Sequence, residues 1–98
     1  MKKYESLKIG VVGCGYWATN LIKTFEDNNI KNVTIFDNKY SQIKSIKKKF
    51  DFVKISKSFE NLINLNLDCI FLITPSSTHF ELARKIINKG HNLFLEKP

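Results

Sequence analysis

The chain has 98 residues, which is enough for one domain with a modest core and too few for a second. Its residues are 43% hydrophobic, yet no stretch approaches the roughly 20 apolar residues of a membrane-spanning helix, so we expect a globular protein without a membrane anchor. The formal net charge of +7 invites nucleic-acid binding, but Arg84 is the only arginine and arginine is the usual reader of base edges, so no nucleic-acid partner is expected.

The first third of the chain predicts a strand, a helix and a second strand. Residues 7–12 form a short apolar run between charged residues and glycine, as a buried strand does. The next apolar residues recur at helical spacing and predict an amphipathic helix that ends at the asparagines of "DNN". Residues 32–37 are β-branched and aromatic, which favours a second strand. The apolar side of the helix consists of Trp17, Leu21, Ile22 and Phe25.

The middle of the chain repeats this alternation. Ser41 is the expected N-cap of a second amphipathic helix. Residues 52–56 predict a short third strand, and Ser58 then caps a brief helix. Residues 67–74 are apolar almost throughout, which indicates a strand in the interior of a sheet.

The last third predicts one more helix and one more strand. Thr78 and Glu81 have the spacing of a capping box at a helix start, and Gly90 is a typical helix end. Within this helix we expect Glu81 to pair with Lys85. Residues 91–98 predict a fifth strand. The residues expected to be buried in the helix are Ala83, Ile86 and Ile87.

Strands that alternate with helices predict an α/β fold in a single domain, residues 1–98. We expect a Rossmann-type parallel sheet of about five strands, with right-handed crossovers that place helices on both faces.

The run "GCGYWA" has the G-x-G-x-x-A spacing of a dinucleotide-binding fingerprint, and it lies between the first strand and the first helix, as that fingerprint requires. Gly13 would form the tight turn, and Gly15 would let a pyrophosphate approach the backbone. The small Ala18 would let the helix pack closely on the strand. The N–H groups of Tyr16 and Trp17 would then face the phosphates at the positive end of the helix, while their side chains point away and pack. A tight turn without a ligand is the alternative explanation.

Asp37 ends the second predicted strand, 24 positions after Gly13, close to the offset of the acid that binds an adenosine ribose. A carboxylate there favours NAD, because it would repel the 2′-phosphate of NADP. The neighbouring Lys39 keeps NADP open as the cofactor. The alternative for Asp37 is a simple turn residue.

The chain ends in "LEKP", so Glu96 and Lys97 leave the fifth strand at the edge where open α/β sheets bind ligands. From the residues alone, an exposed ion pair of little energetic consequence is the favoured explanation.

The chain resembles the amino-terminal domain of the glucose–fructose oxidoreductase, inositol dehydrogenase and MocA family (Gfo/Idh/MocA) of NAD(P)-dependent sugar oxidoreductases. The resemblance rests on "KIGVVGCGYWATN", on "ITPSSTHFELARKIINKGHNLFLEKP" and on Asp37, and it covers the chain. It implies that Thr74 and Pro75 line the nicotinamide side of the cofactor site, with His79 nearby.

The resemblance further implies that Glu96 and Lys97 match the family's E-K-P motif, whose lysine lies beside the nicotinamide and the reacting carbon–oxygen group. A hydroxyl proton departs as hydride leaves a sugar carbon, so the Lys97 ammonium would stabilise charge on oxygen or relay that proton. The implied function is hydride transfer between NAD(P) and the hydroxyl or keto group of a sugar or nucleotide-sugar, with Lys97 as the catalytic residue.

Members of the family carry a second, carboxy-terminal domain with the substrate pocket and usually the oligomer interface. We therefore expect the chain to be truncated before that domain in a homo-oligomeric parent enzyme, to bind cofactor weakly if at all, and to turn nothing over. The alternatives are a non-catalytic nucleotide-binding or sensor module and, through its lysines, a nucleic-acid-binding domain.

Remaining chemistry-bearing residues suggest no further site. No group of His, Cys, Asp and Glu has metal-ligand spacing, so no metal is expected. Cys14 and Cys69 lie in apolar runs and predict free thiols in a cytoplasmic protein. The amino terminus lacks the apolar segment of a signal peptide.

Overall fold

A computed structural model describes residues 6–74 and 76–95, which form one parallel sheet between two layers of helices. The strands are β1 (Lys8–Val12), β2 (Asn32–Phe36), β3 (Lys54–Ile55), β4 (Cys69–Leu72) and β5 (Asn92–Leu95). The helices are α1 (Tyr16–Asp27), α2 (Tyr40–Lys49), α3 (Phe59–Ile63) and α4 (Ser76–Asn88).

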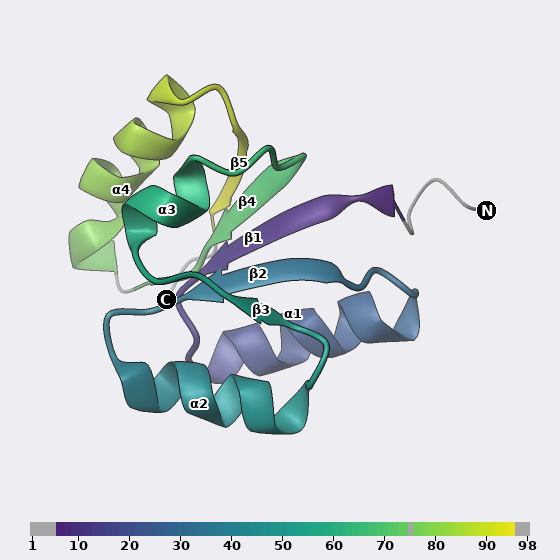
Figure 1. Cartoon of the computed structure of the whole chain (residues 1–98). Helices are drawn as coiled ribbons and strands as arrows, with labels where there is room; N and C mark the ends of the chain where they lie inside the picture. The colour runs from purple at the N-terminus through teal and green to yellow at the C-terminus, as the bar shows by residue number, and fades with distance from the viewer. Residues whose placement is uncertain (1–5, 75, 96–98) are drawn as a thin grey trace.

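The sheet has the order β3-β2-β1-β4-β5, and every neighbouring pair is parallel. The chain builds outward from β1 to β3 and then crosses back to β4 on the other side of β1. Because right-handed crossovers in opposite directions use opposite faces, α1 and α2 cover one face and α3 and α4 the other (Figure 1). The predicted fold class, a five-strand Rossmann-type sheet with helices on both faces, is confirmed.

Parallel pairing brings the carboxyl ends of the strands to one edge of the sheet. Val12 of β1 is in register with Phe36 of β2 and with Leu72 of β4, and Leu72 is in register with Leu95 of β5. The turns after β1, β2 and β4 therefore meet at the point where the strand order reverses, which is where open α/β sheets bind ligands.

The core lies on both faces of the central strand, because successive side chains of a strand point to opposite faces. Ile9 and Val11 pack toward α1 and α2, whereas Val12 packs with Ile70 and Leu72 on the face of α3 and α4. None of the helices formed by the described residues has the length and apolar content that crossing a bilayer requires.

Several predicted helix ends are confirmed. Ser58 Oγ accepts a hydrogen bond from the Asn61 amide at 3.0 Å and so caps α3. Asn29 adopts a left-handed φ of 61° just after α1, and Gly90 has φ 88° after α4. Asparagine and glycine tolerate this conformation, which ends a helix.

The two other predicted helix starts are wrong. α2 begins at Tyr40 with Lys39 as its N-cap and no side-chain cap, so Ser41 already lies within the helix. The Lys39 amide donates to Asp37 Oδ1 at 2.8 Å, and the helix starts two residues earlier than the capping rule predicts. α4 begins at Ser76, which places Thr78 in its first turn instead of at the N-cap.

Two predicted contacts of α4 are also wrong. Glu81 pairs with Arg84 at 3.2 Å, while the Lys85 ammonium lies 3.9 Å from Glu60 of α3. Ile86 is buried, but Ile87 is 59% exposed because the next residue along a helix is turned away from the sheet.

Candidate cofactor-binding site

The turn between β1 and α1 is built on Gly13, which has a φ of 107° that side chains rarely adopt. Its amide donates to the carbonyl of Phe36 at 2.8 Å and ties the turn to β2. On the other side a Cβ atom on this residue would lie 2.9 Å from the carbonyl carbon of Ile73. Glycine is therefore required here by both the backbone conformation and the proximity of the segment after β4.

Gly15 has a different environment. It is the N-cap of α1 with an ordinary φ of −81°, and a Cβ atom on it would have no neighbour within 4 Å. No side chain caps α1, and its first turn contains no acidic residue. The positive end of the helix thus faces open space, which is the environment that an anionic group such as a pyrophosphate requires.

Behind the turn, Ala18 is fully buried and packs in the core with Val11 of β1. The expectation that the side chains of Tyr16 and Trp17 pack in the interior is wrong. They are 77% and 53% exposed and contact each other edge to face with ring centroids 5.6 Å apart.

Asp37 lies directly beside the glycine turn, and both of its carboxylate oxygens accept backbone hydrogen bonds. Oδ2 accepts from the Cys14 amide at 2.7 Å, and Oδ1 accepts from the Lys39 amide at 2.8 Å. A carboxylate offers about four lone-pair positions, so each oxygen can accept one further bond, for example from a ribose hydroxyl. The position of Asp37 is compatible with binding a ribose. Its bond to the Lys39 amide also makes it a turn residue, which is the alternative explanation from the sequence.

A cavity of about 440 Å³ opens next to Asp37 at the carboxyl ends of β2 and β3. Most of the residues that line this cavity were not predicted from the sequence. The predicted ends of the second and third strands could have indicated them, because the loops that follow neighbouring parallel strands lie at the same edge of the sheet. The lining residues are Phe36, Asp37, Asn38, Tyr40, Ile43, Ile55, Ser56 and Lys57.

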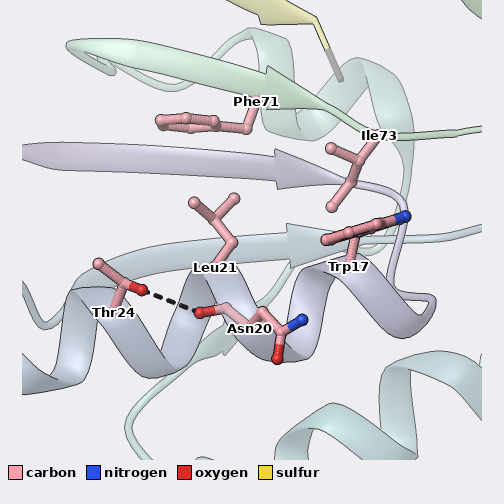
Figure 2. A pocket seen from close by; sticks show the side chains of 6 residues that line it. All are labelled: Trp17, Asn20, Leu21, Thr24, Phe71 and Ile73. Carbon is pink, nitrogen blue, oxygen red and sulfur yellow. Dashed lines mark hydrogen bonds between the residues drawn. The ribbon is translucent and has the colours of Figure 1, made fainter. Parts of the chain in front are cut away.

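A second, mainly apolar groove of about 280 Å³ lies between α1 and the end of β4. Figure 2 shows Trp17 and Leu21 of α1 facing Phe71 and Ile73 across it. Phe71 in turn stacks on Phe94 of β5, with ring centroids 4.8 Å apart, and Phe94 is 53% exposed. Asn20 and Thr24 complete the lining of the groove.

The segment after β4 adjoins the glycine turn. The Ile73 amide donates to the Val12 carbonyl at 2.9 Å, and the Thr74 nitrogen would lie 3.0 Å from a Cβ on Gly13. In α4, Nε2 of His79 is buried without a hydrogen-bond partner among the residues that the structure describes. A buried polar atom of this kind is costly unless a ligand or water satisfies it.

The structure thus brings together the loops that carry Gly13, Gly15, Asp37 and Thr74. Three of the predicted site residues, Pro75, Glu96 and Lys97, lie outside the described residues. β5 reaches the same edge of the sheet at Leu95.

The thiol of Cys14 is buried in the glycine turn. Burial, together with the nearby Asp37 carboxylate, raises the pKa of Cys14 to about 12. The group is therefore a neutral thiol at ordinary pH and a poor nucleophile. Within the described ranges, no three His, Cys, Asp or Glu side chains gather as a metal site would need.

An all-parallel sheet of this strand order, with a glycine turn at the point where the order reverses, defines a dinucleotide-binding α/β domain. The model of the Gfo/Idh/MocA oxidoreductase family, described as an NAD-binding Rossmann fold, matches residues 7–98. The chain therefore belongs to this family and forms its NAD-binding domain.

Individual relatives are distant in sequence. An uncharacterised oxidoreductase of Streptococcus pneumoniae serotype 4 is 29% identical over 96 residues, which are 94% of this chain and 25% of that protein. The chain thus spans about a quarter of the length of this relative.

Two solved structures share the fold. The WlbA dehydrogenase from Bordetella pertussis, in complex with NADH and UDP-GlcNAcA, matches with a TM-score of 0.80 at 24% identity, over 94% of this chain and 29% of that one. Biliverdin reductase from Synechocystis, in complex with biliverdin and NADP+, matches with a TM-score of 0.83 at 23% identity, over the same shares. At these identities the likeness concerns the fold alone.

Proposed function

We propose that this domain holds NAD with the pyrophosphate against Gly15 and the amides of Tyr16 and Trp17. The observation that carries this proposal is the open space over Gly15 at the uncapped, positive end of α1. A turn that served packing alone would have neighbours at both glycines, whereas only Gly13 has them.

The adenosine half belongs at Asp37 and in the cavity beside it. The carboxylate would accept the ribose hydroxyls, and the cavity between the ends of β2 and β3 has room for a base next to Tyr40 and Ile55. A 2′-phosphate in the same position would approach the negative charge of Asp37. NAD is therefore favoured over NADP, even with Lys39 nearby.

The nicotinamide half belongs beyond the end of β4, beside Thr74, Pro75 and His79. The proximity of Thr74 to the glycine turn supports this assignment. Nε2 of His79, which is buried without a hydrogen-bond partner among the described residues, is a second support, because a bound polar group would supply that bond.

The proposed reaction is transfer of hydride between nicotinamide and a hydroxyl or keto carbon of a sugar or nucleotide-sugar. When bound, the nicotinamide supplies the hydride chemistry. Lys97 follows Leu95 by two residues, and Leu95 ends β5 at the edge of the site, so its ammonium is our candidate to take or give the hydroxyl proton and to stabilise charge on oxygen. The nucleotide-sugar class is supported by the ligand of the WlbA dehydrogenase.

We further propose that the domain is part of a longer oxidoreductase, whose additional part binds the substrate. Parallel sheets are normally covered on both faces. Here Phe94 of β5 is exposed where its ring stacks on Phe71 of β4. Trp17 of α1, on the same side of the sheet, is exposed as well. This uncovered apolar surface and the greater length of the relatives support the proposal.

Calorimetric titration of the 98-residue chain with NAD and with NADP tests the cofactor assignment. We expect weak, saturable NAD binding with a Kd of roughly 0.1–10 mM, and NADP binding at least about tenfold weaker. Trp17 is the only tryptophan, so quenching of its emission by NADH is an independent readout of binding beside the turn. Absence of saturable binding of either cofactor would contradict the proposal.

The role of Lys97 is tested in the complete parent enzyme by Lys97→Ala, with the exposed Lys89→Ala of the α4 end as the matched control. Loss of a proton-transferring group lowers turnover by about 10²–10⁴-fold. Unchanged turnover in Lys97→Ala, with cofactor binding intact, would instead support a non-catalytic nucleotide-binding module.

A further inference from the structure

The carboxylate of Asp37 accepts hydrogen bonds from two backbone amides. Its Oδ2 accepts the Cys14 amide, which lies 23 residues earlier in the chain, at 2.7 Å. Its Oδ1 accepts the Lys39 amide at 2.8 Å. Such charge-assisted bonds are among the stronger hydrogen bonds of a protein.

The Cys14 amide belongs to the residue between the two glycines of the turn. The amide of Gly13 is already bonded to the Phe36 carbonyl, so these two bonds attach consecutive residues of the turn to the end of β2. Next to these two held residues, a Cβ atom on Gly15 would have no neighbour within 4 Å, so the space beside the start of α1 stays open.

We propose that Asp37 is a positioning residue for the glycine turn, in addition to being the ribose ligand of the proposed function on which this inference rests. The carboxylate fixes the turn through the Cys14 amide, so the same side chain organises the pyrophosphate site and the ribose site. Its two amide donors also offset part of its negative charge, which would otherwise oppose an anion at the turn.

One consequence concerns cofactor choice. Replacing Asp37 by a small neutral residue removes the repulsion of a 2′-phosphate, but it also releases the Cys14 amide. Such a variant therefore loses affinity for NAD without gaining useful affinity for NADP.

The chain offers a matched control at the opposite end of β1. Asp68 Oδ2 accepts the Lys8 amide at 2.7 Å, the same bond type and length as that between Asp37 and Cys14. Asp68 lies just before β4, at the end of the sheet away from the glycine turn. Asp68→Ala therefore removes a comparable bond without touching the site.

The first experiment measures amide hydrogen exchange by NMR in the ligand-free chain. Asp37→Ala is expected to speed exchange of the Cys14 amide by about tenfold or more, while the Val11 amide in the middle of β1 changes little. Asp37→Asn, which keeps one acceptor oxygen, is expected to lie in between and serves if Asp37→Ala fails to fold. Unchanged Cys14 exchange in Asp37→Asn and Asp37→Ala would overturn the proposal.

The second experiment separates positioning from ribose binding by titrating ADP and 2′,3′-dideoxy-ADP. If Asp37 only bound hydroxyls, removing its carboxylate would leave the affinity for a ligand without hydroxyls unchanged, or raise it by removing the repulsion of the diphosphate. We expect Asp37→Ala to weaken dideoxy-ADP by about fivefold and ADP by more, and Asp68→Ala to change neither. Dideoxy-ADP affinity that is equal in wild type and Asp37→Ala would overturn the positioning role.

The two experiments also distinguish failure of this inference from failure of the proposed function. If neither nucleotide binds the wild-type chain, the proposed function fails, and the exchange of the Cys14 amide still decides whether Asp37 holds the turn.

Discussion

A Cβ atom on Gly13 would lie 2.9 Å from the carbonyl carbon of Ile73, so the turn after β1 and the segment after β4 are in direct contact. Gly15, two residues later, would meet nothing within 4 Å. The two glycines of one motif thus have separate roles. The first allows the chain to fold, and the second leaves space at the helix end.

This difference predicts opposite effects of the same substitution. Gly13→Ala should lower the free energy of unfolding by about 1–3 kcal/mol, because alanine is strained at a positive φ and meets backbone atoms. Gly15→Ala should stay within about 0.5 kcal/mol of wild type, because its φ of −81° suits any residue. Urea unfolding of the two variants measures both values.

In binding, Gly15→Ala should be the more informative variant. A methyl group in the open space over α1 keeps an anion from the backbone, so NAD affinity should fall by about tenfold or more although the fold is intact. If Gly15→Ala binds NAD as wild type does, the pyrophosphate does not lie where we propose.

The buried thiol of Cys14 predicts a loss of stability at alkaline pH. Its pKa is raised from an ordinary 9.0 to about 12, mainly by burial and further by Asp37. Between these values the unfolded chain ionises and the folded chain does not, so the stabilising contribution is complete below pH 9 and is lost as pH rises toward 12. From pH 8 to pH 10 we expect a loss of about 1 kcal/mol.

Urea unfolding of wild type and Cys14→Ala at pH 8, 9 and 10 isolates this contribution. The variant lacks the titrating thiol, so its stability should fall less steeply than that of wild type over the same range. Parallel curves would show that Cys14 does not ionise differently in the folded and unfolded chain.

Two neighbouring lysines of α2 should differ in their effect on stability. Lys47 Nζ donates to the carbonyls of Asp51 and Val53, at 2.6 and 2.8 Å, and so secures the chain beyond the end of the helix. Lys48 is exposed and makes no comparable bond among the described residues. Lys47→Ala should cost about 1 kcal/mol and Lys48→Ala less than about 0.5 kcal/mol. Equal thermal unfolding midpoints of Lys47→Ala and Lys48→Ala would show that the two bonds of Lys47 do not stabilise the fold.

The exposed apolar surface beside β5 predicts that the isolated chain binds hydrophobic probes. Phe94 stacks on Phe71 next to the groove of Trp17, whereas Phe80 of α4 is 79% exposed without a ring partner among the described residues. Phe94→Ser should reduce fluorescence of the dye ANS markedly, and Phe80→Ser should not, because an apolar patch binds where an isolated ring does not. Similar reductions in both variants would argue against a surface that another part of the parent enzyme covers.

The residues of the glycine turn and the order of strands and helices could be read directly from the chain. An apolar run, a G-x-G-x-x-A spacing and an amphipathic helix are local patterns, and backbone sterics and helix periodicity make them specific enough to place Gly13 and Gly15 in a strand-to-helix turn. The offset of Asp37 located the end of β2 for the same reason. These patterns determined the α/β class and the family.

Other features of the site depend on which strands are neighbours in the sheet, and only the tertiary structure determines this. The bond from Cys14 to Asp37, the ion pair between Lys85 and Glu60, and the cavity that joins Asp37 to Ile55 all connect segments that no local spacing relates. The start of α2 differs for a local reason, because the Lys39 amide bonds the carboxylate of Asp37 two residues earlier and no side chain caps the helix. The parallel order β3-β2-β1-β4-β5 brings distant strand ends to one edge, and the contacts made there determine both the shape of the turn and the residues around it.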